Sequence, residues 1–168
     1  MVLFRPIHPL RPHPPALLAT PATPSFTVEG GLWPLLAVKL GRSGSAEQFE
    51  QYLDVRREWL ERCEPHVCLL DLRDVHLPPC QIRHRYAEWL REHECALRRW
   101  CLGAAYVLTS PEVKMTMSLI RHASHMTLPF VVTATAPPGA AWAAERLQEA
   151  GLAPAATRVR AAYGIAAS

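Results

Sequence analysis

The chain has 168 residues, 49% of them hydrophobic, and a formal net charge of +3 at pH 7. A chain of this size folds as one domain by default and buries about two-thirds of its unfolded surface. Acids and bases are mixed along it, which argues against a protein dedicated to nucleic-acid binding. Apolar residues never run together for about 18 positions, so the sequence predicts no membrane span.

The cysteines are odd in number and lack Cys-x-x-Cys spacing; they are Cys63, Cys68, Cys80, Cys95 and Cys101. Arg5 and Pro6 interrupt the apolar start of the chain, so an export signal is not expected. Reduced thiols in a cytoplasmic protein are therefore the simplest interpretation. Cys68 and Cys101 fall in apolar runs and are interpreted as small core residues.

Both ends of the chain differ in composition from the middle. Residues 1–25 hold seven of the 16 prolines, which lack the N–H donor of helices and ladders, so we expect a disordered tail. Residues 152–168 are rich in alanine and poor in large apolar side chains, so we expect a weakly packed C-terminal tail. The folded domain is predicted between them, over residues 26–151.

Strand and helix patterns alternate within this central region. The predicted elements are strands over 25–29 and 35–40 joined by a tight turn at Gly30-Gly31, a helix over 45–63, a strand over 66–72, a helix over 82–100, a strand over 102–109, a helix over 111–122, a strand over 129–135 and a helix over 140–150. Ser45 with Gln48 is a capping box, and Ser110 before Pro111 is a preferred helix start. The uninterrupted apolar run in 66–72 predicts a strand buried on both faces.

Several short groups of mainly apolar residues along this region form a pattern that is typical of one protein family. They are Phe26-Thr27-Val28, Phe49 with Tyr52-Leu53, Leu70-Asp71-Leu72-Arg73, Arg83 with Arg85, Ala87-Glu88-Trp89-Leu90, Gly103-Ala104-Ala105-Tyr106-Val107, Ser110-Pro111-Glu112-Val113, Pro129-Phe130-Val131-Val132 and Ala141-Trp142-Ala143. The pattern resembles the STAS/SEC14 domain family, also called SpoIIAA-like, in its bacterial single-domain form. The resemblance implies an α/β fold with a mixed sheet of about five strands, flanked by about four helices.

The resemblance also bears on function. Some STAS proteins are switched by phosphorylation of a serine at the start of the helix after the central strand, and that position falls on Cys80 here. A cysteine does not form that stable phosphoester, so the resemblance does not predict this switch. SEC14-type relatives hold lipids in an apolar cavity, although this chain is short for the full lipid-carrying fold.

Arginines on the predicted helix 82–100 are the first functional candidates: Arg83, Arg85, Arg91 and Arg98. Guanidinium groups bind carboxylates and phosphates in bidentate pairs. With Arg73, Asp74 and His76 of the preceding loop, they are the predicted partner-binding residues. The alternative is a solvated helix face with ion pairs such as Glu94 to Arg98.

Asp71 and Cys80 are the candidates for a ligand pocket. Asp71 ends the predicted central strand, and open α/β sheets bind ligands at the carboxyl ends of their strands. Cys80 lies near a helix N-terminus, where a thiolate is stabilised. An enzyme using Asp71 or Cys80 with His76 is conceivable, but no nucleophile elbow, glycine-rich phosphate loop or metal motif accompanies them.

A metal site is not predicted. The residues considered for zinc are His93, Cys95, Cys101, His122 and His125. His93 and Cys95 project about 160° apart on one helix, which disfavours a shared ion.

The leading expectation is a non-enzymatic interaction or regulatory module, without cofactor or nucleic acid, that binds a protein partner or its own copy. A small-ligand or lipid-binding module with a pocket at the strand ends is the first alternative. A Cys- or Asp-dependent enzyme is the second. An apolar pocket of drug-like size would favour the ligand module, and a short contact between Cys80 and His76 beside a cleft would favour the enzyme.

Overall fold

The computed structural model describes residues 26–42 and 45–166. Its strands form one sheet in sequence order: β1 (Phe26–Glu29), β2 (Leu35–Leu40), β3 (His66–Asp71), β4 (Cys101–Val107) and β5 (Phe130–Thr133). β1 is antiparallel to β2, and the other neighbours are parallel. The predicted α/β class, with a mixed five-stranded sheet, is confirmed. The proline-rich tail expected over residues 1–25 lies outside the described residues.

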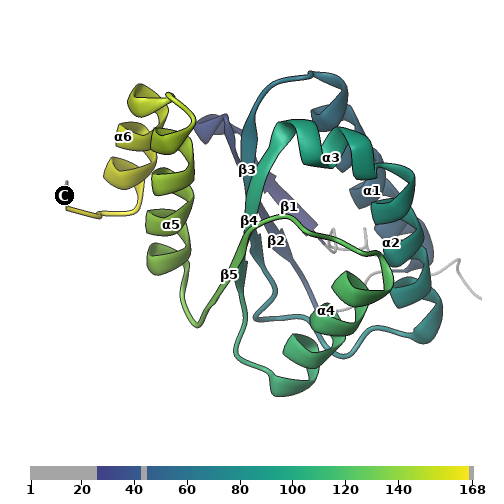
Figure 1. The fold of residues 1–168 in the computed structure, drawn as a ribbon. Helices are drawn as coiled ribbons and strands as arrows, with labels where there is room; N and C mark the ends of the chain where they lie inside the picture. The colour runs from purple at the N-terminus through teal and green to yellow at the C-terminus, as the bar shows by residue number, and fades with distance from the viewer. Residues whose placement is uncertain (1–25, 43–44, 167–168) are drawn as a thin grey trace, which may run out of the picture.

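Helices cover both faces of the sheet. They are α1 (Ala46–Glu61), α2 (Cys80–Glu92), α3 (Glu94–Trp100), α4 (Pro111–Ala123), α5 (Ala136–Glu149) and α6 (Ala153–Ala162), with a short 3₁₀ turn η1 (Gly30–Leu32). Figure 1 shows α1 to α4 on one side of the sheet and α5 with α6 on the other. Within the described ranges, no helix combines the length and apolar character needed to cross a bilayer.

Alternation along the central strands divides the core between these two layers. Leu36, Val38, Cys68 and Leu70 belong to the cluster under α1 to α4. Leu35, Ala37, Val67 and Leu69 belong to the cluster under α5 and α6. Successive strand side chains point to opposite faces, so a strand covered on both sides needs apolar residues at every position. This requirement explains the uninterrupted apolar run of β3.

Local signals in the sequence set the helix starts. The Gln48 backbone N–H donates to Ser45 Oγ at 3.2 Å and the Ser45 N–H to Gln48 Oε1 at 3.2 Å, so the predicted capping box of α1 is confirmed. At α4, the Val113 N–H donates to Ser110 Oγ at 3.3 Å. The β1–β2 hairpin is also present, but its connection is η1 followed by a turn rather than the expected tight turn at Gly30-Gly31.

The predicted single helix over 82–100 is two helices that meet at His93. His93 leaves helical geometry, with φ −106° and ψ 12°. Its ring Nδ1 lies 2.9 Å from the Trp89 carbonyl oxygen and the ring stacks on Trp89 at 4.4 Å. Arg91 and Arg98 therefore lie on different helices, and helical spacing does not align them as the sequence predicted.

The C-terminal segment differs from the expected weakly packed tail. Ala155, Ala156 and Val159 of α6 are buried, in one cluster with residues of α5 such as Ala144 and Leu147. Small side chains let two helices approach closely, so an alanine-rich helix packs well against another. The prediction of weak packing was therefore wrong for α6, because a helix without large apolar side chains can still bury its alanines.

A β-bulge interrupts the pairing of β3 with β4. His66 lies opposite Cys101, but Val67 lies opposite Gly103, so β4 carries one extra residue there. Gly103 has φ +152°, and a Cβ atom on it would lie 2.5 Å from the Trp142 ring and 2.9 Å from the Pro129 carbonyl oxygen. The bulge therefore requires glycine at this position.

We predict that Gly103→Ala lowers the free energy of unfolding by about 2 kcal/mol or more, because the new methyl group combines a strained φ with a clash. Gly31→Ala is the matched control, since nothing lies within 4 Å of its Cβ position. Urea unfolding curves give both values. An effect of Gly103→Ala as small as that of the control would contradict the bulge.

Candidate functional site

A cavity of about 390 Å³ lies at the carboxyl ends of β2 and β3. Three helices line it: α1 through Gln48, Phe49 and Tyr52, α2 through Ile82, Arg83 and Tyr86, and α4 through Val113, Thr116, Met117 and Ile120. Strand ends and the following loop complete the lining with Leu40, Gly41, Arg42, Leu70, Leu72, Val75, His76, Leu77, Pro78 and Pro79. The walls are mainly aliphatic and aromatic, so the cavity suits an apolar ligand.

Arg83 is the unusual polar group of this lining. Its Nε is buried and has no hydrogen-bond partner in the part of the chain that the structure describes. No ion pair involves Arg83 within the same residues. A buried donor without an acceptor is unfavourable, and a guanidinium favours an anionic group.

Two tyrosines of the cavity wall are held by a buried arginine. Arg56 Nη1 donates to Tyr52 Oη at 2.9 Å and to Tyr86 Oη at 3.3 Å. The Arg56 guanidinium also lies 5.1 Å from the centre of the Trp89 ring. Burial raises the pKa of Tyr52, so its hydroxyl stays protonated.

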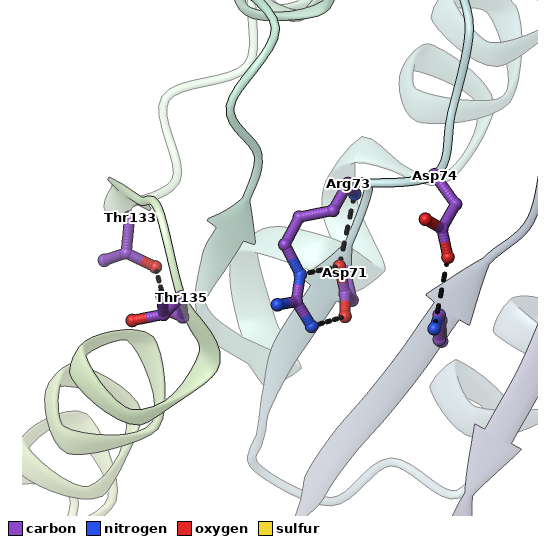
Figure 2. Close-up of polar contacts among 6 residues, drawn as sticks. Asp71, Arg73, Asp74, Thr133 and Thr135 are labelled. Carbon is purple, nitrogen blue, oxygen red and sulfur yellow. Dashed lines mark hydrogen bonds and ion pairs between the residues drawn. The ribbon is translucent and has the colours of Figure 1, made fainter.

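Figure 2 shows two polar contacts after β3: Arg73 binds Asp71, and Asp74 binds a residue of the neighbouring strand β2. Arg73 donates to Asp71 Oδ1 from Nε at 3.0 Å and to Asp71 Oδ2 from Nη2 at 2.7 Å. These hydrogen bonds lower the pKa of Asp71. Lys39 Nζ lies 3.1 Å from Asp74 Oδ2. The three residues therefore order the start of the loop after β3.

The predicted ligand-pocket residues lie outside the cavity. Asp71 continues the alternation of Val67 and Leu69, which face α5 and α6 rather than the cavity. Cys80 begins α2 and is exposed. His76 does line the cavity, but no hydrogen bond joins it to Cys80 within the described residues. The observation that would have favoured the enzyme is thus not found in this part of the chain.

The predicted arginine face is divided among different contacts. Arg85 pairs with Glu50 of α1 at 2.8 Å, and Arg98 pairs with Glu94 at 2.7 Å. Arg91 is exposed, whereas Arg83 lines the cavity. The structure therefore brings Arg83 and His76 of the predicted partner-binding set to one site and leaves the others elsewhere.

A second cluster lies at the amino ends of β3 and β4. His66, Cys68 and Cys101 are all buried, and one potential ligand atom of each lies within 4.8 Å of the others. The other histidines and the cysteine considered for zinc, namely His93, Cys95, His122 and His125, are not in this cluster. Contact with Cys101 and the nearby Arg56 charge lower the pKa of the Cys68 thiol.

Sequence reasoning missed Arg56, Tyr86 as a cavity residue, and the pairing of His66 with Cys68. The spacing of Tyr52 and Arg56 by four residues on the apolar face of α1 was a usable signal, because it places both on one side of a helix. The alternation of His66 and Cys68 was another, because it places both on one face of a strand. The contribution of Cys101 depends on the bulge, which no local pattern indicates.

Comparison of the chain with protein-family models, curated proteins and solved structures found no match. The STAS/SEC14 resemblance therefore remains a prediction.

We predict that Asp71→Asn lowers the free energy of unfolding by about 1–2 kcal/mol at neutral pH, because it removes charge-assisted hydrogen bonds from Arg73. The folded-state pKa of Asp71 is below its ordinary value of 3.8. The stabilisation is therefore complete above that ordinary value and is lost as the pH falls through the folded-state pKa. Urea unfolding over a pH series measures it.

Asp74→Asn is the control, because the side chains of Lys39 and Asp74, which form an ion pair, are each 54% exposed. Exposed pairs contribute little, so this variant should stay within about 0.5 kcal/mol of the parent. The free energies of unfolding of Asp71→Asn and the parent should converge at acid pH. A difference that persists or grows there would contradict the stabilising role of the Asp71 carboxylate.

Proposed function

We propose that the protein is a binding module for an amphiphile with an apolar chain and an anionic end. The observation that carries the proposal is the apolar cavity at the strand ends with the unpartnered Arg83 in its wall. This function was the first alternative from the sequence, and it now ranks above the interaction module. No catalytic step is part of the proposal.

The size and chemistry of the cavity support an apolar chain. A volume of about 390 Å³ falls within the range of about 300–1,000 Å³ typical of small-molecule sites. Leu72, Ile82, Val113 and Ile120 line it with aliphatic carbon, which gains free energy when an alkyl chain displaces water.

The charge of the cavity supports an anionic end. Arg83 offers a buried Nε without an acceptor, and Arg42 adds a second guanidinium to the lining. No Asp or Glu lines the cavity among the described residues. A carboxylate or phosphate satisfies such donors, and a cation would not.

We predict that decanoate binds to the full chain and that Arg83→Met weakens this binding at least about tenfold, because the variant removes a charge-assisted hydrogen bond and keeps the apolar stem. Decanol should bind the parent and Arg83→Met equally, since it has no charge. Isothermal titration calorimetry measures all four affinities.

Arg91→Met is the matched control, because Arg91 is an exposed residue of the same helix and does not line the cavity. It should bind decanoate as the parent does. An equal loss of affinity in both variants would indicate general charge attraction and contradict a site at Arg83. The absence of binding of either compound to the parent would contradict the ligand-binding function itself.

An interaction module that binds its own copy is the second candidate. Met115 and Leu119 are 61% and 58% exposed and lie four residues apart on α4, so they form an apolar strip on its outer face. We predict self-association of the full chain that Met115→Ser with Leu119→Ser abolishes. Sedimentation velocity over a concentration series measures it, and a parent that stays monomeric would contradict this candidate.

A further inference from the structure

We propose that His66, Cys68 and Cys101 form a three-coordinate site for a copper(I) ion. The site lies at the amino ends of β3 and β4, whereas the amphiphile cavity lies at the carboxyl ends of β2 and β3. The two proposals therefore rest on different residues and are tested independently.

The three side chains are brought together by the bulge in β4. His66 and Cys68 are two residues apart in β3, so both face the layer of α1 to α4. In a regular strand, Cys101 would face the opposite side from Ala104, since the two are three positions apart. The extra residue before Gly103 places both in the same cluster. Bulges re-aim side chains in this way, and this one requires the strained Gly103.

The distances fit a shared ion. The potential ligand atoms of the three residues lie within 4.8 Å of one another. Donors that share one ion lie at most about 4.6 Å apart when each bond is about 2.3 Å long. Small side-chain rotations therefore complete the coordination without any change of the backbone.

The histidine is oriented for coordination. His66 Nδ1 lies 3.0 Å from the Glu64 carbonyl oxygen. Because a carbonyl oxygen only accepts, Nδ1 carries the hydrogen, and the lone pair is then on Nε2. A ligating histidine commonly donates its other N–H to a carbonyl, which fixes the ring and its tautomer.

Charge balance favours a monovalent ion. Arg56 is 95% buried and its hydrogen bonds go to tyrosine hydroxyls, with no carboxylate partner among the described residues. The segments outside those residues contain no Asp or Glu. Two thiolates, a neutral imidazole and copper(I) carry one net negative charge, which the neighbouring Arg56 balances. Zinc(II) with the same ligands is neutral and leaves Arg56 unbalanced.

The ligand types support the same ion. Cysteine thiolates select soft ions, copper(I) among them, and imidazole also suits copper. Structural zinc takes four protein ligands, whereas the described residues supply three here.

The experiment uses the full chain, reduced and free of oxygen, titrated with copper(I) alone in competition with the chelator bicinchoninate. We expect one copper per chain, with near-ultraviolet thiolate-to-copper absorption. X-ray absorption should give two sulfur neighbours and one nitrogen neighbour. Cys68→Ala and Cys101→Ala should each weaken binding at least about tenfold, because loss even of an outer-shell partner commonly costs that much.

A surface variant makes the test independent of whether the core variants fold. It combines Cys63→Asn, Cys80→Ser and Cys95→Ser at the exposed cysteines, with Asn chosen because Cys63 has φ +53°. This variant should bind copper(I) as the parent does. Loss of copper from it, failure of the parent to compete with the chelator, or equally tight retention of zinc(II) by the parent would each overturn the proposal.

Discussion

The contacts of the buried Arg56 guanidinium connect the cavity at the strand ends with the cluster of His66, Cys68 and Cys101. The guanidinium joins α1 to α2 through Tyr52 and Tyr86, lies over Trp89, and acts electrostatically on the buried thiols of Cys68 and Cys101. An ion is expensive to bury, and the hydroxyls and ring faces around Arg56 provide only partial compensation. The proposed copper site would supply the missing negative charge on one side. On the other side, the tyrosines that Arg56 holds form part of the wall of the cavity at the strand ends.

The two faces of the sheet are packed differently because the helices that cover them carry side chains of different size. On the α5 and α6 side, alanines and Gly139 pack closely, and most of the cluster is fully buried. On the other side, α1, α2 and α4 meet large side chains such as Phe49, Tyr86 and Met117 over the strand ends. The cavity lies on this face, between these three helices and the carboxyl ends of β2 and β3.

Local patterns in the sequence predicted much of the fold. The capping box at Ser45 and the helix start at Ser110 reflect interactions within a few residues, and the structure has both. The apolar run of β3 reflects burial on both faces, which leaves its mark within one short segment. The break at His93 was missed because it depends on contacts of one ring with Trp89. The packing of α6 was missed because large apolar residues were taken as necessary for a core, whereas two alanine-rich helices pack through close approach.

The candidate site was harder to predict than the fold. Arg83 and His76 were named from the sequence, but Asp71 and Cys80 lie outside the cavity because strand alternation and the position of α2 turn them elsewhere. The cavity is lined by residues from five segments of the chain, namely the end of β2, α1, the end of β3 with its loop, α2 and α4, and no single motif encodes it. The thiol cluster likewise depends on the register of β3 and β4, which the composition of neither strand specifies.

In our proposal, the space at the strand ends holds an amphiphile with its anionic end at Arg83. A crystal structure of the full chain with decanoate tests it most directly. We expect the carboxylate within hydrogen-bond distance of the Arg83 guanidinium and the alkyl chain between α1, α2 and α4. A cavity closed by Phe49 and Met117, or decanoate bound at another surface without contact to Arg83, would contradict this function.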